Sequence, residues 1–151
     1  MTINITTSSL VSEVRQKSHF ETKYIQDLEL RDNARAGLEK ADELNRCISV
    51  ADAQLRALLT RYLQTVTQDT VSAGITVPAT LSYVLGLSER RDANKCEQLP
   101  QLMRDYLVCA ALSKYYATVS VTDLASKRGN EAAALGAEII RILFFKNPPV
   151  L

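Results

Sequence analysis

The sequence predicts a mainly α-helical protein, a bundle of about four to five helices with one short β element. Over most of the chain, apolar residues recur at the i, i+3, i+4, i+7 spacing that marks the buried face of a helix. Residues 80–87 instead alternate between apolar and polar residues, which is the pattern of a strand. With 151 residues, 46% of them hydrophobic and 23% charged, we expect a single globular domain over residues 1–151.

The predicted strand needs a partner, because its backbone groups would otherwise lack hydrogen bonds. The other alternating segment is residues 2–6, which read Thr-Ile-Asn-Ile-Thr. Two arrangements stay open: residues 80–87 pair with 2–6 of the same subunit, or they pair with a strand of a neighbouring chain. Residues 1–19 are also a candidate flexible arm.

Two helical segments are expected next. Residues 20–40 alternate acidic and basic side chains around a thin apolar stripe of Tyr24, Ile25, Leu28 and Leu38. This pattern is typical of a solvent-exposed helix, which is either simply solvated or leans on another subunit. Residues 41–66 have apolar residues along one face and charged residues along the other, which predicts an amphipathic helix facing the core.

The second half of the chain predicts the centre of the bundle. Leu99-Pro100 opens a helix that is apolar nearly all round from residue 106 to 112, as expected of a buried central helix. A short helix over residues 121–127, stopped at Gly129, and a last helix over 131–145 follow. The sequence Asn147-Pro148-Pro149 ends the last helix.

The charge balance excludes a global attraction to nucleic acid, since 18 Lys and Arg oppose 17 Asp and Glu. Residues 70–88 carry no charge, but they are rich in Ser and Thr and contain Gly74, Pro78 and Gly86, so a membrane span is not expected. The start of the chain lacks the basic and apolar regions of a signal peptide. We therefore expect a cytosolic protein.

No residue pattern predicts catalysis. Cys47, Cys96 and Cys109 are far apart and odd in number, which favours buried thiols in a reducing compartment over a zinc site. The single histidine, His19, lies in a charged peripheral segment. The run from Glu89 to Asp92 is either an arginine pair for a phosphate or carboxylate, or a self-neutralised helix start. We expect no enzymatic activity, small-molecule substrate, cofactor or metal.

Residues 121–129, together with the helix that follows, resemble the helix-turn-helix of small DNA-binding regulators, with Gly129 at the turn. A DNA-binding regulator that uses residues 121–145 is therefore the alternative function. The segment that would read DNA begins Glu-Ala-Ala-Ala-Leu-Gly at residues 131–136 and offers no hydrogen-bond donor to base edges. This composition argues against sequence-specific binding.

A longer resemblance covers about two-thirds of the chain and depends on the order of its helices. An amphipathic helix at 51–63 is followed by an irregular apolar connection, a helix opened by Leu99-Pro100 that runs from 102 into Lys114-Tyr115-Tyr116, and a last helix ahead of Pro148. This order is similar to the small head-tail connector, head-completion or neck adaptor proteins of tailed bacteriophages and prophages, including Mu-like phages. The charged segments 13–40 and 89–98 depart from their pattern.

The resemblance implies a non-enzymatic helical protein that joins the portal of the phage head to the tail. Such proteins assemble as homo-oligomeric rings with other virion proteins, so each subunit needs two different contact surfaces. The protein would be made in the bacterial cytoplasm and incorporated into the virion. The candidate subunit-interface residues come from the strand, the arginine pair after it and the charged outer helix: Tyr83, Leu85, Leu87, Arg90, Arg91, Arg31 and Arg35.

Overall fold

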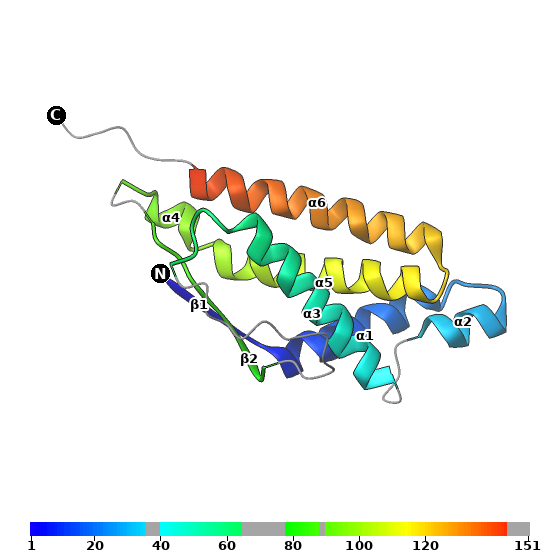
Figure 1. Ribbon diagram of the computed structural model, residues 1–151. Helices are drawn as coiled ribbons and strands as arrows, with labels where there is room; N and C mark the ends of the chain where they lie inside the picture. The colour runs from blue at the N-terminus through cyan, green and yellow to red at the C-terminus, as the bar shows by residue number, and fades with distance from the viewer. Residues whose placement is uncertain (36–39, 65–77, 88–89, 145–151) are drawn as a thin grey trace.

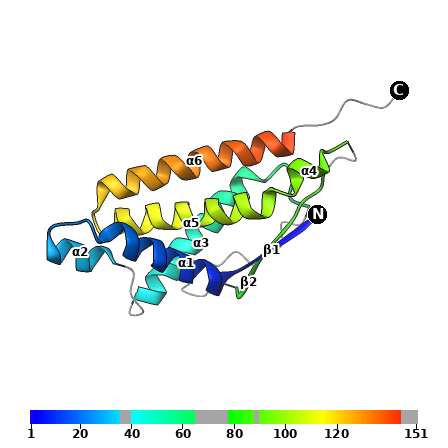
Figure 2. The ribbon, with the colours of Figure 1, turned by 180° about the vertical axis from the view of Figure 1, so that it is seen from behind.

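The computed structural model describes residues 1–35, 40–64, 78–87 and 90–144, and it confirms a mainly helical fold with one small sheet (Figure 1). The elements follow the order β1 (Thr2–Thr6), α1 (Thr7–Thr22), α2 (Leu28–Ala34), α3 (Ala41–Leu58), β2 (Thr80–Val84), α4 (Ala93–Cys96), α5 (Leu99–Thr118) and α6 (Thr122–Phe144). Helix α6 lies along α5, and seen from behind α1 lies along the other side of the bundle, with α2 beyond its end (Figure 2).

The two strands pair with each other in the same subunit. β1 and β2 are antiparallel, with Ile3 opposite Tyr83 and Ile5 opposite Leu81. These four side chains are buried, whereas Thr2, Asn4 and Thr6 between them are exposed, so one face of the hairpin covers the core. Met1 and Leu85 extend the pairing by two more hydrogen bonds: Leu85 N donates to the Met1 carbonyl at 2.7 Å, and the Met1 ammonium donates to the Leu85 carbonyl at 3.1 Å. Of the two arrangements that the sequence left open, the intramolecular one is observed.

The prediction of a flexible arm over residues 1–19 is wrong. α1 begins directly after β1, and Leu10 and Val14 on its inner face are fully buried. Arg104 of α5 also holds this helix, since its guanidinium donates to the Glu13 carboxylate at 2.9 Å and to Ser9 Oγ at 2.8 Å. The N-terminal residues are therefore part of the core.

Residues 20–40 do not form one helix. α1 ends at Thr22, and α2 starts at Leu28 because the Asp27 carboxylate caps it by accepting hydrogen bonds from the backbone N–H groups of Glu29 and Leu30. α3 likewise ends at Leu58, earlier than expected, and the chain then turns so that Gln64 N donates to the Val84 carbonyl at 2.9 Å. Residues 65–66 of the predicted helix lie outside the described residues.

Residues 122–144 form one continuous helix, so the predicted stop at Gly129 is wrong. A glycine inside a helix costs about 1 kcal/mol relative to alanine. Here it lies on the α5 side, where a Cβ atom would stand 3.1 Å from Ser113 Oγ of α5. Gly129 therefore fits the close approach of two helices and does not act as a turn.

α5 is the central helix, as its composition predicts. Its buried residues include Met103, Leu107, Leu112, Tyr115 and Tyr116, and its last turn closes with Ser120 in the left-handed conformation, φ 64°. The N–H groups of Ser120 and Val121 return to the carbonyls of Ala117 and Tyr116, which is the Schellman ending of a helix. This tight turn reverses the chain, so that α6 packs back along α5.

Candidate subunit interfaces

The structure places the predicted interface residues of the strand inside the subunit. Tyr83 is 0% exposed and Leu85 1% exposed, while Leu87 is half-buried against the core. Tyr83 on β2 and Leu85 just after it pack in the core of their own subunit. They are therefore not available to a neighbour in this conformation. This corrects their assignment as contact residues.

A polar cluster holds the buried face of β2 to α3. The Tyr83 hydroxyl donates to Asp52 Oδ1, and the Arg56 Nε–H is shared between both oxygens of Asp52 at 3.1 Å. The Arg56 guanidinium also lies over the Tyr83 ring, 4.4 Å from its centroid, and donates to the Ser82 carbonyl. Burial and the neighbouring Asp52 carboxylate both raise the pKa of Tyr83, so its hydroxyl stays a donor.

The predicted arginines occupy two separate places. Arg90 and Arg91 are exposed just before α4, which Asp92 caps through the N–H groups of Asn94 and Lys95. Arg31 and Arg35 are half-buried on and after α2, and the Arg35 carbonyl accepts a hydrogen bond from the Tyr115 hydroxyl at 2.9 Å. Arg35 therefore fastens α2 to the bundle, and Arg90 and Arg91 do not join it in one surface.

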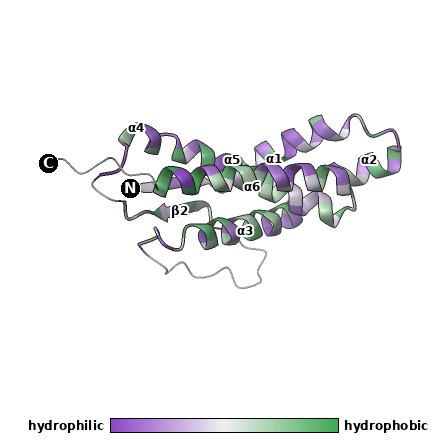
Figure 3. Cartoon of the chain, turned by 90° about the horizontal axis from the view of Figure 1, so that it is seen from above, coloured by the Kyte–Doolittle hydropathy of each residue, from purple (hydrophilic) through white to green (hydrophobic). Residues whose placement is uncertain are grey.

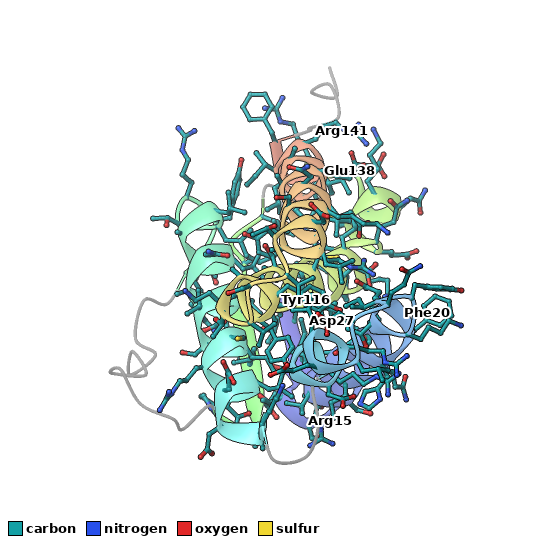
Figure 4. All side chains as sticks on the ribbon, turned by 90° about the vertical axis from the view of Figure 1, so that its right-hand side faces the viewer. Arg15, Phe20, Asp27, Tyr116, Glu138 and Arg141 are labelled. Atoms are coloured by element: carbon teal, nitrogen blue, oxygen red, sulfur yellow. The ribbon has the colours of Figure 1, made fainter. Side chains whose placement is uncertain are left out.

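An exposed aromatic surface, which sequence reasoning did not single out, is formed by Phe20, Lys23 and Tyr24 at the end of α1. We call these three residues the aromatic patch. Phe20 is 61% exposed and Tyr24 72% exposed, and their rings meet edge to face with centroids 6.5 Å apart. Lys23 Nζ lies 4.2 Å from the Phe20 centroid and 5.0 Å from that of Tyr24. The end view shows Phe20 projecting away from the bundle (Figure 4).

The patch faces outward because the opposite face of the same helical turns is polar and buried. Ser18 and Thr22 are 0% exposed. Their hydroxyls donate to backbone carbonyls, Ser18 to Ala34 at 3.3 Å and Thr22 to Ser18 at 2.7 Å, which satisfies them inside the protein. With these positions turned inward, Phe20 and Tyr24 are left on the outer face.

An ion pair anchors the patch from behind. The Glu21 carboxylate accepts a hydrogen bond from Arg128 of α6, and the two side chains are only 7% and 13% exposed. Arg128 also donates to Glu131 at 2.6 Å. Burial disfavours the charged form of Arg128, but its hydrogen bond and ion pair with Glu21 outweigh that cost and raise the pKa of the guanidinium. The backbone that carries Phe20 and Tyr24 is thereby held to α6.

The large exposed apolar residues gather at two ends of the bundle. Phe20, Tyr24, Leu28 and Leu30 belong to the end where α1 gives way to α2, which we call the α2 end. Met1 and Phe144 belong to the other end, where the N-terminus and the last turn of α6 lie, which we call the α4 end (Figure 1), while Leu58 lies against α6 near Gly136. Along the helices between these ends, hydrophilic and hydrophobic residues are interleaved (Figure 3).

Chemistry-bearing groups do not gather at either end. Among the described residues, no group of three or more His, Cys, Asp and Glu side chains could hold a metal ion. His19 is exposed on α1, and all three cysteines are buried, as expected of Cys47 and Cys109. Burial raises the pKa of the Cys47 thiol to about 11, which keeps it protonated and unreactive. In the described part of the chain, no helix combines the length and apolar character needed to cross a membrane.

The helix-turn-helix alternative loses its geometric basis. The motif needs two helices joined by a turn, whereas residues 122–144 are one helix with Gly129 inside it. Its exposed residues in the region proposed to read DNA are alanines, Ala133 and Ala134. Nothing in this geometry favours the DNA-binding hypothesis, which stays a prediction from sequence.

Comparison with known proteins identifies no relative: no protein-family model, curated protein or solved structure matches the chain.

Proposed function

We propose that this protein is a non-enzymatic subunit of the head-tail connector of a tailed bacteriophage or prophage, and that it works as a ring of identical subunits. The observation that carries the proposal is the placement of the large exposed apolar side chains at the two ends of one helical bundle. A ring subunit contacts its two neighbours through two different surfaces. The two ends meet that requirement, because the α2 end carries the aromatic patch and the α4 end carries Met1 and Phe144.

The polar groups of the bundle also support an assembly role over a catalytic one. The buried carboxylates Glu21 and Asp52 are paired with arginines of the same chain, and the tyrosine hydroxyl beside Asp52 donates to it. Such internal pairing ties the helices to one another. The described surface has exposed apolar residues surrounded by charged ones, which is typical of a protein–protein interface.

The order of the elements gives further support. An amphipathic helix, a helix opened by Leu99-Pro100 and a last helix follow one another as in the connector proteins that the sequence resembles. The charged segment that departs from that pattern includes α2 and the end of α1, where the aromatic patch lies. We therefore assign this addition a role in contacts that are particular to this protein.

The experiment that tests the function combines the purified chain with a purified portal protein of a phage or prophage that encodes it. Light scattering after size exclusion and negative-stain electron microscopy would be used on the chain alone and on the mixture. We expect a ring, either alone or seated on the portal. A mass that stays at 16.7 kDa at high concentration, with no ring on the portal, would contradict the proposal.

A further inference from the structure

The aromatic patch is built to bind an extended apolar segment. Its two rings lie edge to face, and Lys23 Nζ lies over both of them. The Glu21–Arg128 pair fixes the helical turn beneath them. A rigid, mostly exposed aromatic surface costs little conformational entropy when it binds a partner.

The chain itself contains a segment of matching chemistry. Residues 145–151 read Phe-Lys-Asn-Pro-Pro-Val-Leu, so five of the seven are apolar and two consecutive ones are proline. Pro-rich segments bind to surfaces of exposed aromatic rings, because their extended conformation is preformed and the flat rings stack on proline. This segment continues from Phe144, which is 73% exposed at the α4 end.

The charges are complementary as well. The only charged side chain in residues 145–151 is Lys146. Next to the aromatic patch, the start of α2 carries exposed acids at Asp27, Glu29 and Asp32. Lys146 comes before the two prolines and would meet these acids where the segment enters the surface, which favours one direction of binding.

We infer that the aromatic patch of one subunit binds residues 145–151 of a second copy of this chain. The segment is too short to reach the patch of its own subunit and lie across it. Arg128, which pairs with Glu21 behind the patch, precedes Phe144 by sixteen residues of α6, or about 24 Å along the helix axis. Seven fully extended residues span at most about 25 Å, so nothing would remain to cover the rings.

This inference rests on the proposed function and names the contact between neighbouring subunits of the ring. Binding between the α4 end of one copy and the α2 end of the next is heterologous, so it propagates from subunit to subunit and closes into a ring where the rotation allows.

The test mixes two variants, each of which lacks one half of the contact. The first is a deletion of residues 145–151, and the second is Phe20→Gln with Tyr24→Gln, which keeps good helix formers at the exposed positions. We expect the wild type to form oligomers, each variant alone to be monomeric, and an equimolar mixture to give dimers and nothing larger. Oligomers formed by the deletion variant at wild-type concentrations would overturn the inference, as would a mixture that stays monomeric while the wild type assembles.

A binding measurement separates this contact from the connector role. A labelled peptide of residues 145–151 is titrated onto the deletion variant and followed by fluorescence anisotropy. We expect saturable binding of the peptide to the deletion variant. Its affinity should fall at least tenfold when the deletion variant also carries Phe20→Gln and Tyr24→Gln. A peptide with serine in place of Pro148 and Pro149 should lose binding as well. The exposed Leu58→Gln variant is the matched control and should bind normally.

The outcomes distinguish the two claims. Peptide binding without any ring on the portal would retain the contact and refute the connector function. Rings on the portal that form equally well without residues 145–151, with no peptide binding, would retain the function and refute the contact. Binding that the patch variants leave unchanged would also refute the contact.

Discussion

Arg128→Met tests whether the buried ion pair holds α1 to α6. The substitution keeps an unbranched apolar stem but removes the cation that Glu21 and Glu131 share. Glu21 is only 7% exposed, so its carboxylate would be left with little water and no counter-charge. Breaking a buried pair in this way costs about 3–5 kcal/mol, and we expect the lower value because Arg128 itself is 13% exposed.

For a chain of 151 residues, each kcal/mol lowers the Tm by about 2–4 °C, so Arg128→Met should lower it by about 6–12 °C. Thermal unfolding followed by circular dichroism measures the change. Arg141→Met is the matched control, because Arg141 pairs with Glu138 on the exposed face of the same helix, and it should leave the Tm unchanged.

A double variant isolates the charge. Adding Glu21→Gln to Arg128→Met removes the unpaired carboxylate, so part of the lost stability should return. If Arg128→Met changes the Tm no more than Arg141→Met does, or if Glu21→Gln worsens the loss, the ion pair does not anchor α1.

Three further substitutions or conditions test other parts of the fold. Tyr83→Phe removes the hydrogen bond to the Asp52 carboxylate and should cost about 1.5 kcal/mol in urea unfolding, whereas the exposed Tyr24→Phe should cost nothing measurable. Ser120→Gly should raise the Tm, because the left-handed conformation, φ 64°, costs a non-glycine residue about 1–2 kcal/mol and the entropy cost of glycine offsets only part of that; a lower Tm would contradict the turn. The free energy of unfolding should fall as the pH rises from 9 to 11, because burial raises the pKa of Cys47 from 9.0 to about 11, so the unfolded thiol releases its proton first. Cys47→Ala should reduce this decrease in the free energy of unfolding. An unchanged decrease in the Cys47→Ala variant would contradict the role of the Cys47 thiol.

The parts of the fold that could be predicted from sequence are those with a sustained period. On α3, the helical spacing of the apolar residues shows which of them are buried, namely Leu44, Ile48, Ala51 and Leu55. On α5, apolar residues on all sides of the helix show that it is buried. The alternation at 2–6 and 80–84 likewise predicts both strands. Whether they pair within one chain could not be decided from the alternation, since either arrangement buries the same face.

The aromatic patch could not be predicted, because it reverses the usual rule. Ser18 and Thr22 are buried and Phe20 and Tyr24 are exposed, which hydrophobicity alone assigns the other way round. The buried hydroxyls are stable only through backbone carbonyls that α1 and α2 bring to them. The one available signal was the spacing of Phe20 and Tyr24, four residues apart, which places both rings on one helix face.

The break between α1 and α2, and the continuity of α6 through Gly129, have causes that are hard to recognise in a single sequence. Asp27 starts α2 as a cap, a role that its place in a run of alternating charges conceals. Gly129 stays helical because α5 approaches it closely, which depends on tertiary packing. Turn residues were therefore overinterpreted at Gly129 and missed at Asp27.

Cross-linking between copies tests most directly whether opposite ends of neighbouring subunits meet. Gln26→Cys places a thiol beside the aromatic patch, and Arg141→Cys places one near the end of α6; both positions are exposed, while the native cysteines are buried. The two singly substituted chains, one carrying a mass tag, are mixed, assembled and treated with a short bismaleimide. We expect the joined pairs to be Gln26→Cys with Arg141→Cys. Assembled chains that join predominantly through like positions, or through neither, would contradict it.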